Sequence, residues 1–214
     1  RAGSKFTWQA DRTLLATQKK DEGTVFREQG KYEEAMALFN ESIELNPNYA
    51  NAYNNRGNVY KDLKQYDMAL ADYNKALEIN PNFYQSYANI GNTYRELKQY
   101  DKALENLNKA LKINPNDFLI NSVLGLVYKN LEQYDMAIEN YNKALEIKND
   151  NDLVYFLRGN AYAISENYNK AIDDYNKAIA INPNTSSTYN NRGLTYYYLK
   201  QYENAISDFT RAIA

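Results

Sequence analysis

The side chains in this sequence whose types and spacing suggest chemistry are carboxamides that recur at a fixed interval. Asn55 and Asn89 are 34 residues apart, and Asn191 falls on the same interval further along the chain. Each amide offers both a hydrogen-bond donor and an acceptor, and a peptide main chain presents the complementary groups at almost every residue. A column of such amides therefore favours recognition of a peptide backbone over chemical catalysis.

Composition narrows the chemistry further. The 214 residues include no Cys and no His, which removes disulfides, thiolate nucleophiles, imidazole bases and the usual ligands of zinc and haem. The formal net charge is −2, so there is no broad cationic field for a nucleic acid. Neither a membrane-span pattern nor a signal-peptide core is found. We expect no enzymatic activity, cofactor, metal, nucleic acid or membrane partner, and a cytoplasmic or nuclear location.

The same interval governs the residues that must position the amides. Glycine, alanine and tyrosine each occupy a complete column of six positions spaced by 34 residues. The columns are Gly23, Gly57, Gly91, Gly125, Gly159 and Gly193; Ala35, Ala69, Ala103, Ala137, Ala171 and Ala205; and Tyr32, Tyr66, Tyr100, Tyr134, Tyr168 and Tyr202. The four prolines follow the interval too, with Asn149 in the vacant slot. The chain is therefore an internal repeat.

Each repeat contains two stretches with the apolar spacing of a helix. Glycine inside the first helix costs about 0.5–1 kcal/mol relative to alanine, so we expect the second helix to approach closely there, with its column alanine as the partner. An acidic residue near the start of the second helix suits the helix dipole. We expect the Asn-Pro pair at its end to provide a left-handed cap and to stop the helix.

These columns resemble the signature of the tetratricopeptide repeat family. The matching residues of the second repeat are Tyr53, Gly57, Tyr60, Ala69, Tyr73, Ala76 and Pro81. The resemblance implies an all-α, right-handed superhelical solenoid of antiparallel helix pairs, whose first helices line a concave groove. One slot departs from the family, because the residue before the glycine, usually Leu, is Arg56, Arg158 or Arg192 in three repeats and Glu22 in the first.

Six repeats are predicted, at residues 16–49, 50–83, 84–117, 118–151, 152–185 and 186–214, the last being incomplete. Residues 1–15 lie off the repeat, and we expect an expression remnant followed by an added helical turn, with Trp8 covering the first repeat. The last repeat stops within its second helix without a polar capping helix. We expect either a fragment of a longer protein or an end covered by a second copy.

The residues opposite the core stripe of each first helix should face the groove. In the second, third and sixth repeats they include the polar residues Asn51, Asn55, Asn58, Gln85, Asn89, Asn92 and Asn191. The column resembles the asparagine ladder in the superhelical repeat domain of O-GlcNAc transferase, which implies that these amides hold a peptide main chain. The alternative is that an Asn-rich sequence places Asn on every exposed face.

The same wall becomes apolar in the later repeats. Its predicted patch consists of Leu119, Val123, Leu126, Leu153, Phe156, Leu157, Leu194 and Tyr198. Exposed apolar area of this size usually marks a contact surface, which would suit an amphipathic helix or an apolar peptide segment. The alternative is that these side chains pack on one another inside a tight bend.

The carboxylate clamp of co-chaperones, another use of the family, is matched only in part. Lys20 and Asn55 occupy clamp slots, but Thr24 stands where an Asn belongs, and Gln85 and Asn89 replace the two basic residues. We therefore predict a protein–protein interaction scaffold that binds a peptide or helical segment. The alternatives are a substrate-recruiting arm of a larger enzyme, such as a glycosyltransferase, and a self-associating structural module.

Overall fold

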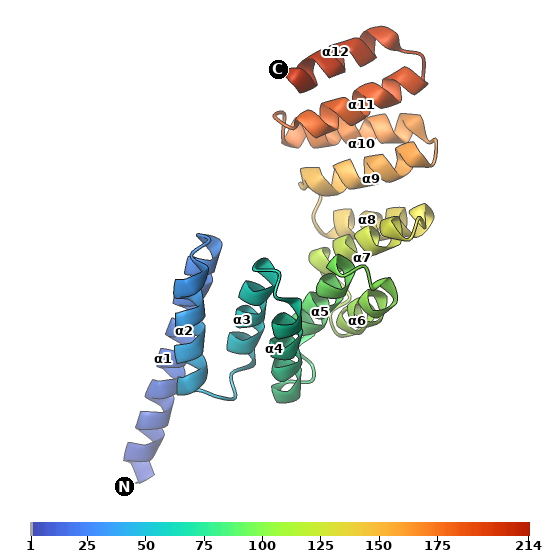
Figure 1. Ribbon diagram of the computed structural model, residues 1–214. Helices are drawn as coiled ribbons and strands as arrows, with labels where there is room; N and C mark the ends of the chain where they lie inside the picture. The colour runs from blue at the N-terminus through green and yellow to red at the C-terminus, as the bar shows by residue number, and fades with distance from the viewer. Residues whose placement is uncertain (1) are drawn as a thin grey trace. The chain divides into compact units, whose positions relative to one another are not determined.

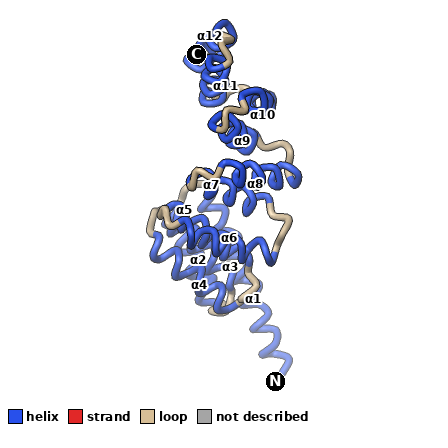
Figure 2. Tube along the Cα trace, turned by 90° about the vertical axis from the view of Figure 1, so that its right-hand side faces the viewer, coloured by secondary structure: helices blue, strands red, loops and turns tan. Residues whose placement is uncertain are grey.

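The computed structural model describes residues 2–214, with side chains from Trp8 onward; Arg1 and the side chains of residues 2–7, which belong to the predicted off-repeat segment, lie outside the described part. Within residues 2–214 the chain forms twelve α-helices and no strand (Figure 2). The helices are grouped in two compact units, of which the first ends at Ile113 and the second begins at Asn114.

Unit 1 contains three helix pairs and unit 2 another three (Figure 1). The helices of unit 1 are α1 (Ala2–Glu28), α2 (Tyr32–Leu45), α3 (Ala50–Asp62), α4 (Tyr66–Ile79), α5 (Tyr84–Glu96) and α6 (Tyr100–Ile113). Those of unit 2 are α7 (Phe118–Asn130), α8 (Tyr134–Ile147), α9 (Asp152–Ile164), α10 (Tyr168–Ile181), α11 (Ser186–Tyr198) and α12 (Tyr202–Ile213).

Each first helix packs against the second helix that follows it, and each second helix packs against the next first helix of its unit. The predicted all-α architecture of stacked helix pairs is confirmed. In the described part of unit 1, α1 also contacts α3 and α3 contacts α5, whereas the second helices make no comparable contact with each other. The first helices are therefore the more closely spaced row, and they line the inner side of this unit.

The glycine column marks the place where the two helices of a pair come closest. A Cβ atom on Gly57 would lie 2.7 Å from Cε1 of Tyr73 and 3.2 Å from the carbonyl oxygen of Ala69, and one on Gly125 would lie 2.4 Å from Cε1 of Tyr141. Such distances are shorter than normal carbon contacts, so glycine is the residue that fits. The expected close approach is confirmed, but its nearest partner is the side chain four residues after the alanine, which is Leu107 in the third repeat and an aromatic ring in the other five.

The helix ends differ from one expectation. Asn46 and Asn80, which end α2 and α4, have extended backbones with φ of −139° and −134°, so the predicted left-handed cap at Asn-Pro is wrong. The Oδ1 atom of Asn46 accepts a hydrogen bond from the backbone N–H of Asn48 at 3.1 Å, and this Asx turn redirects the chain without a positive φ. The left-handed residues instead follow the first helices, at Gly30, Lys64, Lys98, Glu132, Glu166 and Lys200.

Arginine in the slot before the glycine ties three helices together. Nε and Nη2 of Arg158 donate to the two carboxylate oxygens of Asp174 at 2.8 and 2.7 Å, and Nη1 donates to Oδ1 of Asn142 at 2.8 Å. Asp174 lies on the partner helix α10, whereas Asn142 lies on the preceding helix α8. Arg56 and Arg192 make the same three contacts in their repeats. The departure from the family pattern is thus a repeated structural device.

The N-terminal helix also departs from expectation. Residues 2–15 continue α1 without a break, but Trp8 is 62% exposed and does not cover the first repeat. The expected packing of Trp8 is therefore wrong. Its ring contacts the guanidinium of Arg12, whose Cζ lies 4.8 Å from the ring centroid, and Arg12 also donates to the carbonyl oxygen of Glu44 at 3.0 Å. The arginine shields one ring face, and the rest remains open to solvent.

Candidate functional site

The predicted amide column of unit 1 lies on its first helices, and we call this set of residues the polar wall. It consists of Asn51, Asn55 and Asn58 on α3, and Gln85, Asn89 and Asn92 on α5. Asn51 and Gln85 are exposed, and the other four residues are half-buried. The structure therefore brings together six of the seven predicted polar residues, while Asn191 lies in unit 2.

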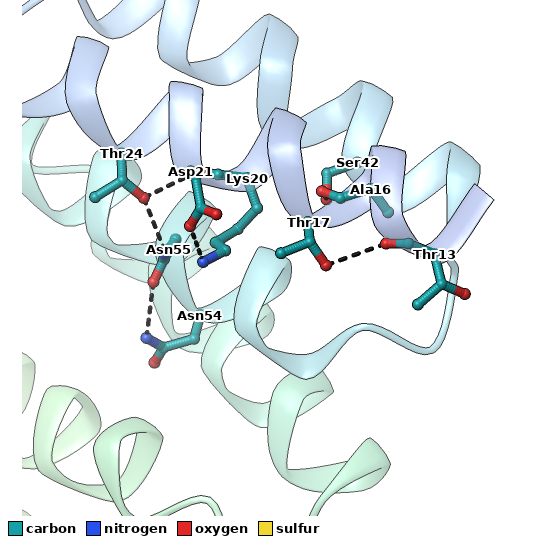
Figure 3. A network of polar contacts seen from close by, with 9 residues as sticks. All are labelled: Thr13, Ala16, Thr17, Lys20, Asp21, Thr24, Ser42, Asn54 and Asn55. Carbon is teal, nitrogen blue, oxygen red and sulfur yellow. Dashed lines mark hydrogen bonds and ion pairs between the residues drawn. The ribbon is translucent and has the colours of Figure 1, made fainter. Parts of the chain in front are cut away.

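Hydrogen bonds fix the orientation of Asn55 (Figure 3). Its Nδ2 atom donates to Oγ1 of Thr24 at 3.1 Å, and its Oδ1 atom accepts from Nδ2 of Asn54 at 3.3 Å. The Thr24 hydroxyl in turn donates to the carbonyl oxygen of Lys20 at 2.9 Å. Because an amide has two N–H donors and two acceptor lone pairs, Asn55 keeps one donor and one acceptor position for a further partner.

Asn54 joins this network to α5. It is 5% exposed, and its Oδ1 atom accepts hydrogen bonds from Oγ of Ser86 at 2.9 Å and from Nδ2 of Asn89 at 3.0 Å. A continuous series of polar contacts thus runs from α1 through α3 to α5. Sequence reasoning missed Asn54, although the doublet of Asn54 and Asn55 recurs 136 positions later as Asn190 and Asn191.

The side-chain amides of Asn58 and Asn92, which are also part of the polar wall, each accept one hydrogen bond. Oδ1 of Asn58 accepts a hydrogen bond from the hydroxyl of Tyr73 at 2.8 Å, and burial raises the pKa of Tyr73, which keeps that hydroxyl a donor. Oδ1 of Asn92 accepts from Nε of Arg95 at 2.9 Å. In both residues the amide nitrogen makes no hydrogen bond to another described residue, so it is available as a donor.

In unit 2 three predicted residues meet in one open pocket of about 600 Å³. They are Asn191, Leu194 and Tyr198, and the pocket is completed by Lys129, Asn160, Ala163, Ile164, Glu166, Tyr168, Tyr175 and Thr195. Its polar centre is Oδ1 of Asn160, which accepts from Nδ2 of Asn191 at 2.9 Å and from the hydroxyl of Tyr175 at 2.7 Å. Asn160 was not predicted, although it stands 68 positions after Asn92 in the column that also contains Asn58.

Aromatic rings form one side of this pocket. The rings of Tyr168 and Tyr198 stack with centroids 5.6 Å apart and an interplanar angle of 12°. Tyr197 contacts Tyr198 edge-on at 5.9 Å. Tyr198 is 57% exposed and Leu194 is 44% exposed, so the pocket presents apolar surface beside two partly satisfied amides.

The rest of the predicted apolar patch does not join the pocket. Leu119 and Leu153 are 68% and 57% exposed, whereas Val123 and Leu126 are half-buried. The other two members, Phe156 and Leu157, pack against the core cluster of unit 2 that includes Tyr141, Val154 and Tyr155. The ring of Phe156 also lies 6.2 Å from that of Tyr175. Packing against this cluster therefore makes part of the surface of Phe156 and Leu157 unavailable to a ligand.

No group of three or more acidic side chains in this part of the chain is arranged to hold a metal ion. None of the helices in residues 2–214 combines the length and apolar character needed to cross a bilayer.

Family models match nearly the whole repeat region. A model described as TPR repeat matches residues 23–64, 91–132, 130–164 and 159–199. Two models described as Tetratricopeptide repeat match residues 50–83 and 186–214 in one case and residues 72–105 in the other. Among curated proteins, no sequence matches this chain.

Solved structures with the same fold span most of the chain. One from the functional characterisation of Pseudomonas aeruginosa pilF has a TM-score of 0.84 at 19% identity, covering 92% of this chain and 90% of that one. YrrB, described as a TPR protein with an unusual peptide-binding site, has a TM-score of 0.68 at 27% identity, covering 82% and 90%. MamA has a TM-score of 0.68 at 24% identity, covering 73% and 92%.

Proposed function

This chain belongs to the tetratricopeptide repeat family, and we propose that it is a protein-interaction scaffold whose polar wall binds an extended peptide segment of a partner protein. Membership of the tetratricopeptide repeat family supports a partner that is a protein or a peptide. The observation that carries the finer proposal is the hydrogen-bonded series from Thr24 through Asn55 and Asn54 to Asn89, because it orients the ladder amides before any ligand arrives.

Orientation matters because binding loses free energy whenever a flexible side chain must be ordered, about 0.5–1.5 kcal/mol for each such side chain. Asn55 and Asn89 are already ordered by their intramolecular bonds. The side-chain amide of Asn55 keeps one N–H and one lone pair free for a ligand. The side-chain amide of Asn89 keeps one N–H and both lone pairs of Oδ1, because Oδ1 makes no hydrogen bond to another described residue. This donor and acceptor set is what an extended main chain requires.

The similarity to YrrB supports the proposal, since YrrB is described as having a peptide-binding site and is 27% identical to this chain. In unit 2 the pocket beside Asn160 and Asn191 offers the same amide chemistry next to Leu194 and the stacked tyrosines. We propose that this pocket receives an apolar side chain of the peptide, while the side-chain amides of Asn160 and Asn191 form hydrogen bonds with the adjacent peptide main chain.

The test is a peptide selection followed by measured affinities. Twelve-residue peptides are selected on the wild-type protein from a random library, labelled, and titrated by fluorescence anisotropy. The double variant Asn55→Ala and Asn89→Ala removes five free hydrogen-bonding positions, and each one that the peptide uses contributes about 0.5–1.5 kcal/mol. A total loss of about 2 kcal/mol corresponds to roughly thirtyfold weaker binding.

The matched control is Asn74→Ala with Asn108→Ala. These asparagines are also 34 residues apart, but they are exposed on the second helices α4 and α6 and make no hydrogen bond to another described residue. The control should bind within about twofold of wild type, because it leaves the wall intact. Peptides with N-methylated backbone amides should bind poorly to the wild type. Equal losses in both double variants, or full affinity of the methylated peptides, would show that main-chain recognition by the wall is wrong.

A further inference from the structure

Charged side chains gather at the C-terminal ends of the first helices of unit 1. The last turns of α1, α3 and α5 contain Arg27, Lys61 and Arg95, respectively, and the neighbouring carboxylates are Asp62 and Glu96. Cations near the C-terminus of a helix are stabilised by its dipole, so their presence alone does not indicate a site. The informative feature is how these three cations and two carboxylates are paired.

Both carboxylates are already engaged. Nε and Nη2 of Arg27 donate to the two oxygens of Asp62 at 2.6 and 3.2 Å. Oε2 of Glu96 accepts from the hydroxyl of Tyr66 at 3.0 Å, and its Oε1 lies 3.7 Å from Nη2 of Arg95. The two arginines thus use the two acidic groups.

Lys61 is the remaining cation. Its ammonium makes no hydrogen bond and no ion pair with any other described residue, although the side chain is half-buried. Burial lowers the pKa of Lys61, Arg27 and Arg95 lower it further, and the attraction of Glu96 and Asp62 only partly compensates. The protein therefore holds a half-buried ammonium group near two carboxylates, neither of which pairs with it directly.

We propose that Lys61 binds a carboxylate of the segment held by Asn55 and Asn89, so that this protein selects acidic peptides. The inference rests on the proposed function of the polar wall. Lys61 follows Asn55 by six residues of α3, about 9 Å along the helix axis, which an extended peptide spans in roughly three residues. A carboxylate a few residues from the anchored main chain can reach the ammonium.

The pairing of these groups favours one class of anion. Arg27 and Arg95 have hydrogen-bond or ion-pair partners, whereas the ammonium of Lys61 has none among the described residues, and a singly charged carboxylate would supply that partner. A phosphorylated side chain carries close to two negative charges and would be repelled by Asp62 and Glu96. The carboxylate belongs either to an Asp or Glu side chain or to the C-terminus of the peptide, and the experiment separates these sources.

The experiment uses an array of N-acetylated, C-amidated twelve-residue peptides in matched pairs that differ only by Asp in one member and Asn in the other. Wild-type protein should bind the Asp member about tenfold more tightly, the effect of one charge-assisted hydrogen bond. Lys61→Met should abolish that preference, and Lys61→Arg should restore it. Two further arms carry phosphoserine in place of Asp, or Asn with a free C-terminal carboxylate.

The matched control is Lys112→Met, because Lys112 also lies in the last turn of a helix, is exposed, and makes no ion pair with another described residue. It should keep the tenfold preference. Thermal unfolding must show that Lys61→Met is folded. If the wild type binds the pairs equally, or the Met variant keeps the preference, the Lys61 proposal is wrong while the polar wall stands. If no peptide of the array binds, both proposals fail.

Preference for phosphoserine over Asp would overturn the pairing argument and the proposal with it. A tenfold gain from the free C-terminus that Lys61→Met removes would support a carboxylate contact and assign it to the chain end. A gain that survives in the Met variant would place the contact elsewhere and would overturn the proposal.

Discussion

Replacing the arginine of one inter-helix contact should be severely destabilising alone and nearly neutral when its partner is also changed. The perturbation is Arg158→Leu, Asp174→Asn and the double variant. Arg158 makes two charge-assisted hydrogen bonds to Asp174, which is 3% exposed. Where the third and fourth repeats carry Ile90 or Leu124 in the arginine slot, the aspartate slot holds Asn106 or Asn140.

The magnitude follows from the charges left behind. Arg158→Leu strands a buried carboxylate, which costs about 3–5 kcal/mol of unfolding free energy. In the double variant the asparagine that replaces Asp174 is neutral and can donate to the carbonyl of Lys170, as Asn106 donates to Lys102 at 2.9 Å and Asn140 to Met136 at 2.8 Å. Because well-packed neutral residues often replace a buried ion pair at little cost, the double variant should lie within about 1.5 kcal/mol of wild type.

The assay is urea unfolding followed by circular dichroism for the wild type, both single variants and the double variant. The coupling free energy of this cycle should be about 2–3 kcal/mol. Asp173→Asn, at the exposed neighbouring position, is the control and should change the midpoint little. If the single losses simply add up in the double variant, Arg158 and Asp174 are not coupled and the proposed exchange of an ion pair for an apolar and amide pair is refuted.

Three other changes test separate parts of the structure. Gly125→Ala places a Cβ 2.4 Å from Cε1 of Tyr141 and should lower stability by about 1–3 kcal/mol in thermal melts, whereas a melting temperature equal to wild type would mean the helices can part freely. Lys61→Met should be more stable than wild type at pH 7. Because folding lowers the pKa of Lys61, the unfolded chain binds the proton more tightly, and the wild type gains stability as the pH rises toward 10.5. The urea midpoints of the two proteins should therefore converge near that pH. Leu194→Asp should weaken selected peptides that need the unit 2 pocket by at least tenfold in anisotropy titrations, with Leu119→Asp, outside the pocket, as its control; equal affinity of both variants would remove Leu194 from the contact.

Periodicity predicts the helix pairs and the ladder because both depend on one repeated spacing. The 34-residue columns determine which residues pack in a pair, so the residues opposite them, such as Asn55 and Asn89, can be assigned to the inner side without coordinates. The close approach at glycine follows from the same repeated spacing, whereas the side chain that meets the glycine, four positions after the alanine, was identified only from the structure. These features are local, or they repeat without change.

Other features depend on how successive pairs cross, which the spacing does not contain. Asn54 lies one position before the ladder, where the helices of adjacent repeats meet, and only the crossing brings it within hydrogen-bond distance of Ser86 and Asn89. A residue at the edge of two faces is thus assigned correctly only once the tilt between pairs is known.

The arginine contacts show what internal comparison adds to periodicity. The aspartate slot, sixteen residues after the arginine slot, is acidic in the three repeats whose first slot is Arg and Asn in the two whose first slot is Ile or Leu. That correlated exchange is visible in one sequence, and it identifies Arg158 and its equivalents as structural. Lys61 has no such compensating partner in its own repeat, and its neighbours Asp62 and Glu96 are occupied by other groups. A half-buried ammonium group with no direct partner in the fold is explained more economically by a ligand than by packing, so the test of function lies at Lys61 and not at the arginines.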